Sequence, residues 1–241
     1  MAEKDIYLTI RQGFRDIVER RRIHQEIVTV QAPDYGDAAG LAGPGKEIKL
    51  IAEYDGANGE CWTSFPRPFQ GTLEQIMAMD MENDPADRSI YIAAINAVMN
   101  RYELADECLH CREADEEACA EQIARQYKKN NGNVRVLLAG YQPHMIKALS
   151  AQFPLRVLDL DPENIGKTIY GVTVEDGATA YSDAAWWAEV ILCTGSAISN
   201  GTIYDYIKLP KDVSFYGTTI AGAARILDLR RICPFGRNRA G

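Results

Sequence analysis

The residues best suited to chemistry in this chain lie in one short segment, Ala188–Thr202. A run of apolar residues, Val190–Cys193, is followed at once by small and polar residues, among them Asn200 and Thr202. This pattern predicts a buried parallel strand that ends in a loop, with a helix after it. Because ligands in open α/β sheets bind beyond the carboxyl ends of the strands, the segment predicts where a binding site lies.

Three further predicted strands end in residues of the same kind, and parallel strands bring such ends to one edge of a sheet. Glycine lets a ligand approach the backbone, and free N–H groups at helix starts near Thr202 and Thr218 attract anions. Ordinary turns and helix caps use the same residue types, so both interpretations stay open. As a ligand-binding set, the strand ends supply Gly140, Tyr141, Asp159, Thr194, Gly195, Ser196, Asn200, Thr202, Gly217 and Thr218.

A dinucleotide site has partial support at the first of these strand ends. Asp159 follows Gly140 by 19 residues, close to the distance between a glycine turn and a ribose-binding acid. The sequence after Gly140 lacks the other two glycines of that fingerprint, and Pro143 has no N–H to offer a phosphate. A smaller nucleotide or a methyl-donor cofactor remains open.

A metal site is indicated by Cys108, His110 and Cys111, whose two thiols are spaced to chelate one ion. Thiolates and imidazole suit zinc, copper or iron. Cys119 lies eight residues further on, but no second paired motif follows, so free thiols are the alternative. His144 is a further candidate ligand, because a helix N-terminus favours its neutral form.

Bulk composition excludes several classes of function. The chain has 241 residues, a net charge of -8 and a pI near 5.0, which argues against an electrostatic nucleic-acid binder. No apolar run approaches the roughly 18 residues that span a bilayer, and no signal peptide is visible, so we expect a cytoplasmic protein without membrane contact. Six cysteines in such a chain do not indicate a disulfide framework.

The second half of the chain alternates predicted strands and helices, which indicates a Rossmann-like parallel sheet. Predicted strands cover Val134–Ala139, Leu155–Leu158, Val190–Cys193, Asp212–Tyr216 and Arg231–Ile232. Predicted helices run from Pro143 to about Phe153, within Thr179–Ala188, from about Gly201 to Ile207, and over Thr218–Leu227.

The first half reads differently, with strands before helices, and predicts a separate α+β domain. Predicted strands cover Glu26–Gln31, Glu47–Tyr54 and Glu60–Phe65, and Pro33–Gly45 reads as a loop. Predicted helices cover residues 5–22, 72–79, 86–102 and 116–127, the last followed by a linker-like stretch, Lys128–Asn133. The helix over 86–102 is apolar nearly all round and must be buried, so Asn96 inside it needs hydrogen-bond partners or a cavity.

Three strings of this sequence resemble the putative heavy-metal chelation family: Asp87–Ala97, Leu137–Tyr141 and Thr194–Thr202. The resemblance covers about Ile6 to Phe235. It implies an enolase-N-terminal-like domain followed by a Rossmann-like domain, with the site in the cleft between them. It also implies that Asn96 joins the residues that line the cleft.

These observations together predict three regions: an α+β domain over 1–105, a charged, cysteine-containing connection over 106–133, and an α/β domain over 134–241. The predicted function is binding or chelation of a heavy metal or metal complex, with a transition metal or its complex as the cofactor or ligand. An enzyme that uses a nucleotide-like or methyl-donor cofactor, or a non-catalytic small-molecule sensor, is the alternative. The reaction, the metal and the oligomeric state, including a homo-oligomer, stay open.

Overall fold

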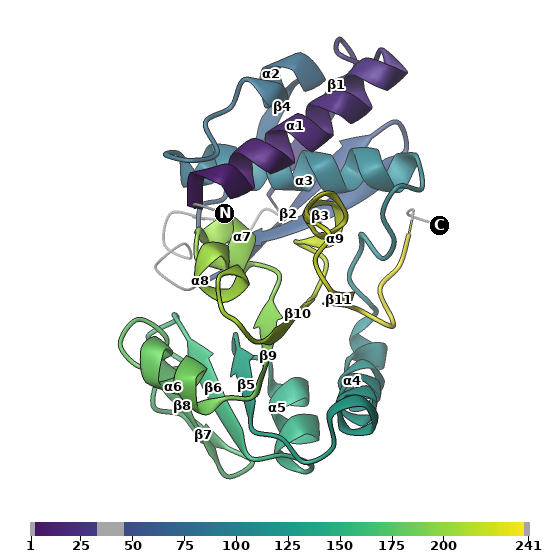
Figure 1. Cartoon of the computed structure of the whole chain (residues 1–241). Coiled ribbons are helices and arrows are strands. Elements are labelled where there is room, and N and C mark those ends of the chain that lie inside the picture. The colour runs from purple at the N-terminus through teal and green to yellow at the C-terminus, as the bar shows by residue number, and fades with distance from the viewer. Residues whose placement is uncertain (1–2, 33–45, 239–241) are drawn as a thin grey trace.

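The fold is described by a computed structural model that covers residues 3–32 and 46–238; the predicted loop Pro33–Gly45 lies outside the described residues. Within the described residues the protein is a mixed α/β structure with two sheets, one from each half of the chain (Figure 1). No helix among them is both long enough and apolar enough to cross a membrane.

The first half forms a four-stranded antiparallel sheet in the order β3-β2-β1-β4. Its elements are α1 (Glu3–Arg21), β1 (Ile27–Gln31), β2 (Ile48–Tyr54), β3 (Ala57–Thr63), β4 (Phe69–Thr72), α2 (Leu73–Met77) and α3 (Pro85–Arg101). The third strand begins earlier than predicted, because Asp55 and Gly56 both have positive φ angles and make a two-residue turn. Strand β4 was not predicted; it pairs with β1.

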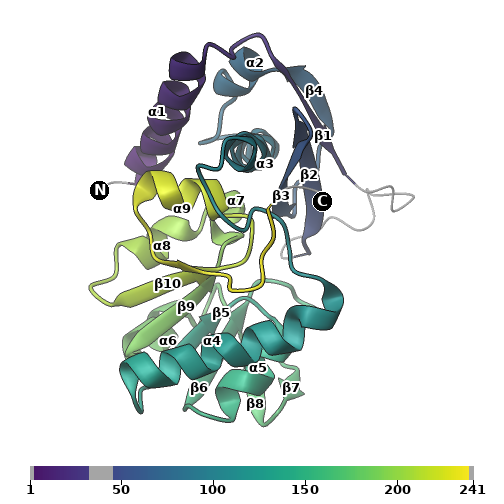
Figure 2. The same ribbon diagram turned by 90° about the vertical axis from the view of Figure 1, so that its right-hand side faces the viewer.

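Helix α3 is the centre of the first half. The Asp84 carboxylate accepts hydrogen bonds from the backbone N–H groups of Ala86 and Asp87, and Pro85 takes the first helical position, as predicted. Residues Arg88–Asn100 are all buried, because the helix has the antiparallel sheet on one side and α1 and α9 on the other (Figure 2). The helix is apolar nearly all round because it is buried on both sides.

The second half forms a seven-stranded sheet in the order β11-β10-β9-β5-β6-β8-β7, parallel except for β7. Its strands are β5 (Val136–Ala139), β6 (Leu155–Asp159), β7 (Thr168–Ile169), β8 (Val172–Asp176), β9 (Val190–Thr194), β10 (Asp212–Tyr216) and β11 (Arg231–Ile232). The sequence did not indicate β7 and β8, a short hairpin whose turn residues Tyr170 and Gly171 have positive φ angles.

Helices cover both faces of this sheet. They are α4 (Glu116–Asn131), α5 (Pro143–Ser150), α6 (Tyr181–Trp187), α7 (Ala197–Asn200), α8 (Ile203–Ile207) and α9 (Ala221–Leu227), with a 3-10 turn at Glu113–Asp115. α4 and α5 pack on the face that carries Val136 and Leu138. The stretch Lys128–Asn133 is not a linker as predicted, because α4 continues to Asn131 and buries Tyr127.

The two halves share one hydrophobic core cluster, which includes Ile95 of α3 and Ala221 of α9. Polar contacts cross the same boundary: the Tyr7 hydroxyl donates to the Ile198 carbonyl at 3.1 Å, and Arg88 Nη1 donates to the Ser199 carbonyl at 3.2 Å. The helices α7 and α9 are therefore fixed against the first half, and they hold the strand ends of the second half close to it.

Candidate functional site

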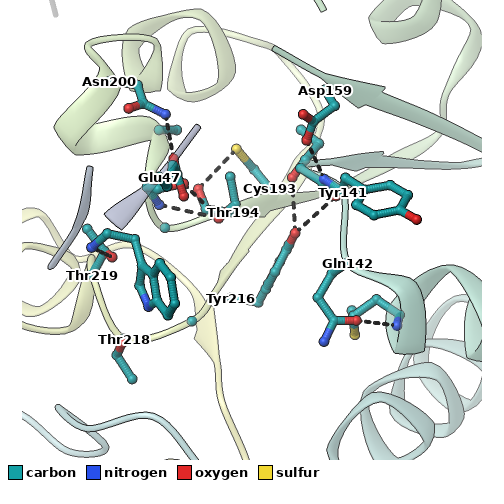
Figure 3. Close-up of a pocket in the computed structure, with 18 of the residues that line it drawn as sticks. Glu47, Tyr141, Gln142, Asp159, Cys193, Thr194, Asn200, Tyr216, Thr218 and Thr219 are labelled. Carbon is teal, nitrogen blue, oxygen red and sulfur yellow. Dashed lines mark hydrogen bonds between the residues drawn. The ribbon is translucent and has the colours of Figure 1, made fainter. Parts of the chain in front are cut away.

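A cavity of about 990 Å³ opens where the carboxyl ends of β5, β6, β9 and β10 face the first half of the chain (Figure 3). The strand ends form one wall. Residues at and near β2 and β3 form a second wall, and the segment that leads into α4 forms a third. The cavity therefore lies where the predicted strand ends converge, between the two sheets.

Ten of the predicted binding residues line this cavity. They come from four strand ends that are separate in sequence: Gly140, Tyr141, Asp159, Thr194, Gly195, Ser196, Asn200, Thr202, Gly217 and Thr218. Gly140 has a φ angle of +103°, and a Cβ atom there would lie 2.8 Å from the Tyr216 hydroxyl. The positive φ angle and the short distance to the Tyr216 hydroxyl each require glycine at position 140.

Asn96 differs from the expectation that it lines the cleft. Its side chain is fully buried behind the cavity wall, where Nδ2 donates to the carbonyls of Glu60 and Thr219, both at 2.8 Å. Nδ2 also reaches the Thr218 carbonyl at 3.3 Å, and Oδ1 accepts the Gly222 N–H at 2.8 Å. Both amide atoms are hydrogen-bonded within the protein and the side chain is fully buried, so Asn96 joins α3, β3 and α9 and does not line the cavity.

Asp159 is used mainly to shape the cavity wall. Its carboxylate accepts the backbone N–H groups of Tyr141 at 2.6 Å and Asp161 at 2.8 Å, and an Asn164 amide at 3.3 Å. These bonds join the ends of β5 and β6. A ribose would have to share a carboxylate that already accepts three hydrogen bonds.

Replacing Asp159 with alanine is expected to lower the free energy of unfolding by about 2 kcal/mol, because two backbone donors lose a charged acceptor. Urea denaturation measures the change. Asp183→Ala is the control, because Asp183 pairs with Arg156 at the surface and should change stability by less than about 1 kcal/mol. Equal effects of the two variants would contradict this role for Asp159.

The start of α5 does not resemble a phosphate-binding helix end. Pro143 occupies the first position of the helix and has no N–H, and the Gln142 side chain accepts the Met145 N–H at 2.6 Å. Two of the donors that would face a phosphate are therefore absent or occupied. This geometry argues against a dinucleotide at β5.

Glu47, which precedes β2, lies at the strand-end wall although the sequence did not single it out. Its carboxylate accepts Asn200 Nδ2 at 2.8 Å (Figure 3). Burial raises the pKa of Glu47, while hydrogen bonds from Ser196 and Asn200 act in the opposite direction and the charge of Asp159 adds to the rise. Asn200 Oδ1 is buried and has no hydrogen-bond partner within the described part of the chain. The Glu47 carboxylate is thus held by an amide whose own oxygen is unpaired and buried.

The raised pKa of Glu47 predicts how the stability of the protein depends on pH. Above about pH 4.5 the carboxyl ionises more readily in the unfolded chain than in the folded one, so the folded state loses stability as the pH rises through this range. Glu47→Gln should therefore raise the melting temperature at pH 7, and the gain should shrink towards pH 4. A melting temperature at pH 7 below that of the wild type would contradict this account.

Glu60 of β3 connects the first half to two cavity walls. The residue is 5 % exposed, and Oε2 accepts the His110 backbone N–H at 2.7 Å and the Thr218 hydroxyl at 3.2 Å. Oε1 lies 3.5 Å from Lys49 Nζ, which in turn lies over the Trp62 ring. Glu60 therefore holds these segments together by hydrogen bonds, and both of its carboxylate oxygens already have partners.

The structure separates the predicted metal ligands. His110 and Cys111 line the cavity, but Cys108 is fully buried and donates its thiol to the Ala105 carbonyl at 3.6 Å. His144 does not line the cavity; its Nε2 lies 3.8 Å from Glu116 Oε2. Within residues 3–32 and 46–238, no three His, Cys, Asp or Glu side chains are arranged to hold one metal ion. Cys108, His110 and Cys111 therefore do not form a three-ligand site.

The charge of the lining is strongly one-sided. Seven carboxylates line the cavity: Glu47, Glu60, Glu113, Glu116, Asp159, Asp161 and Asp205. The permanently positive side chains among the same lining residues are Lys49 and Arg237. A space with such walls attracts cations and repels phosphates.

Sequence reasoning missed one wall of the cavity, to which Glu47, Lys49, Glu60 and Trp62 belong. Glu47 and Lys49 are two residues apart, and so are Glu60 and Trp62. Side chains at this spacing along a strand point to the same face of the sheet. That alternation is visible in the sequence. The other face of this sheet packs on α3 at Gly59, which leaves the face with Lys49 and Trp62 to the cavity, and no local pattern shows this arrangement.

The sequence and the fold both resemble known proteins. Residues 125–227 match the model of the DUF364 family, which carries the description "Putative heavy-metal chelation". A solved DUF364 protein of unknown function from Pyrococcus horikoshii is 17% identical, with a TM-score of 0.55 over 88% of this chain and 78% of that one. Another, from Desulfitobacterium hafniense, is 14% identical, with a TM-score of 0.51 over 75% and 72%. None of the curated proteins matches. The resemblance to this family is thus confirmed for residues 125–227, a shorter range than the predicted Ile6 to Phe235, and the two structures support the mixed α/β fold.

Proposed function

We propose, from the match of residues 125–227 to the heavy-metal chelation family and from the acidic cavity, that the protein binds a positively charged metal complex between its two sheets. The observation that carries the proposal is the lining itself, with seven carboxylates against two permanent positive charges. Metal-free anions such as nucleotides fit this lining poorly.

The size of the cavity favours a complex over a bare ion. About 990 Å³ is the space that proteins provide for organic ligands, whereas a bare ion needs only a shell of contacting atoms. In addition, no group of three acidic, histidine or cysteine side chains within the described ranges is arranged around one point. A metal enclosed in its own ligands needs no such group, because the walls bind the outside of the complex.

Glu47 and Asn200 would make the main polar contacts in this proposal. The Glu47 carboxylate lies at the strand-end wall and is costly to bury in its charged form, so a cation beside it relieves that cost. Asn200 Nδ2 donates to this carboxylate at 2.8 Å and would hold it in place beside the ligand. Thr194 and Ser196 supply further hydroxyl groups near the same point.

A thermal-shift screen tests the proposal with defined probes. Hexaamminecobalt(III), an inert complex with three positive charges, should raise the melting temperature of protein purified without an affinity tag. Hexacyanoferrate(III), an inert anionic complex of similar size, is the matched control and should not. Stabilisation by the anionic complex alone would overturn the proposal.

A methyl-donor enzyme is the second candidate, because S-adenosylmethionine carries a positive sulfonium and so fits the acidic lining better than NAD does. Gly140 and Asp159 occupy the places where such folds hold an adenosine. Stabilisation by S-adenosylmethionine would favour this candidate. A non-catalytic sensor would bind either kind of ligand without turnover.

The strand order of the second sheet supports a proposal about the domains. The strand order β8-β6-β5-β9-β10-β11 follows the 3-2-1-4-5-6 order of doubly wound dinucleotide folds, which supports a Rossmann-like domain over 134–241. We also propose an enolase-N-terminal-like domain over 1–105, a connection over 106–133 and a cytoplasmic location. The partners that we propose are small ligands or a second copy of this chain.

A further inference from the structure

We infer that the metal complex in this cavity carries a flat aromatic ligand, and that the Trp62 indole stacks on that ligand. The inference rests on the proposed function, because it concerns the same cavity and the same cationic complex. It adds the chemical class of the groups that surround the metal, and it names Trp62 as the residue that selects them.

The first support is the aromatic part of the lining. Besides the seven carboxylates, one indole and four phenol rings from both halves of the chain line the cavity: Trp62, Tyr141, Tyr181, Tyr206 and Tyr216. Aromatic faces attract cations and stack on other flat rings. Such a lining suits a cation that carries flat organic groups better than a cation surrounded only by ammonia or water.

Two of these tyrosines have already used their O–H groups within the protein. The Tyr216 hydroxyl lies 3.3 Å from the carbonyl oxygens of both Ala139 and Gly140, and the Tyr181 hydroxyl donates to the Asp205 carbonyl. A hydroxyl group has only one hydrogen to donate. The contact that these two side chains can offer a ligand is therefore mainly aromatic.

The second support is the way in which Trp62 is held in place. Its backbone N–H donates to Thr219 Oγ1 at 2.9 Å, and its carbonyl accepts the Ser199 hydroxyl at 2.6 Å. In the antiparallel pair of β2 and β3 it lies opposite Lys49. The His110 ring approaches the indole at an angle of 67°, with 6.4 Å between the ring centroids. A large ring that is already fixed loses little conformational entropy when a ligand stacks on it.

The indole adds surface to the cavity wall and not to the hydrophobic core. Its neighbours in β3, Cys61 and Thr63, are fully buried, and the Thr63 hydroxyl lies 2.6 Å from the Ser89 hydroxyl of α3. Trp62 alternates to the opposite face of the strand. It is partly exposed and belongs to neither core cluster of the described residues. Filling the core therefore does not explain an indole at this position, whereas stacking on a ligand does.

The surroundings of Trp62 favour positive charge. Lys49 Nζ lies over the ring, 5.8 Å from its centroid, which is within the range of cation–π contacts. The same nitrogen lies 3.5 Å from Glu60 Oε1. The Lys49 side chain is 29 % exposed, so an incoming cation can displace its ammonium group towards the solvent. The indole and the Glu60 carboxylate then face the positive charge of the complex.

Equilibrium dialysis of the full chain against two inert cobalt(III) complexes of equal charge tests the inference. Tetraammine(1,10-phenanthroline)cobalt(III) should bind the wild type about tenfold more tightly than hexaamminecobalt(III), which is the effect of one aromatic stacking contact. Trp62→Leu should lose this preference, and Trp62→Phe, whose ring is smaller, should keep part of it. Trp186→Leu is the matched control and should keep the whole preference, because Trp186 is exposed on α6 and does not line the cavity.

The absorption spectrum of the bound complex gives a second readout. Stacking weakens the absorption band of the phenanthroline ligand, so this band should weaken on binding to the wild type and to Trp186→Leu but not to Trp62→Leu. A merely structural role of Trp62 would not produce this difference. Circular dichroism confirms that each variant is folded, and Trp62→Phe replaces Trp62→Leu if the latter is not.

The outcomes separate this inference from the proposed function. Equal affinity of the wild type for the two complexes would overturn the inference and leave the proposed function standing. A preference that Trp62→Leu retains in full would overturn the role of Trp62. If uncharged 1,10-phenanthroline binds as tightly as its cobalt complex, the proposed function is overturned, because the charge of the metal then adds nothing.

Discussion

Asn96→Ala is expected to lower the free energy of unfolding by about 4 kcal/mol, because it removes one buried amide that joins three elements. The side chain is fully buried and makes four hydrogen bonds, to the carbonyls of Glu60, Thr218 and Thr219 and from the Gly222 N–H. The alanine leaves these groups unpaired in a space that its methyl group does not fill. Urea denaturation gives the change directly.

Asn83→Ala provides the matched control for Asn96. Asn83 is exposed and its amide bonds only to Asp80 within the described residues, so the same substitution should change stability by less than about 0.5 kcal/mol. Ligand binding gives a second readout. A stable Asn96→Ala variant that has lost only the binding of hexaamminecobalt(III) would show that Asn96 contacts the ligand after all, contrary to its position.

Gly59→Ala is expected to be at least as damaging, with a loss of about 4 kcal/mol or more. Gly59 of β3 packs on the backbone of α3, where a Cβ atom would lie 2.1 Å from the Ala97 nitrogen and 2.7 Å from the Ala93 carbonyl oxygen. Neither α3 nor β3 can move locally to make room for the Cβ atom, so the whole sheet must move away from α3. The melting temperature should fall accordingly.

Gly56→Ala distinguishes this crowding from backbone strain. Gly56 has a φ angle of +74°, and a Cβ atom added there would meet no described atom within 4 Å. Only the left-handed backbone therefore opposes the substitution, at about 1–2 kcal/mol. A Gly59→Ala variant as stable as Gly56→Ala would contradict the close packing of β3 on α3.

Prediction from sequence succeeded where one local rule decided the outcome. Asp84 and Pro85 start α3 as expected, and Val190 begins β9 at the predicted residue. It failed where long-range pairing decided. Strand β4 exists because it pairs with β1, and the β7–β8 hairpin forms beside β6, although neither segment has a strong apolar alternation.

The candidate site divides in the same way. Glycines and hydroxyl residues at strand ends could be identified, because parallel strands must place them at one edge. Glu47 could not be identified, because it reaches that edge from the other sheet. The predicted grouping of Cys108 with Cys111 failed for a related reason, because the fold buries Cys108 and leaves Cys111 on the cavity wall.

Equilibrium dialysis of hexaamminecobalt(III) against the wild type, Glu47→Gln and Glu19→Gln tests the central claim most directly. The two variants carry the same change in net charge, but Glu47 lines the cavity and Glu19 is an exposed residue of α1 outside it. We expect saturable binding to the wild type and to Glu19→Gln, and affinity about tenfold lower for Glu47→Gln, equal to about 1.4 kcal/mol. Equal weakening in both variants, or no saturable binding to the wild type, would contradict a metal-complex site in this cavity.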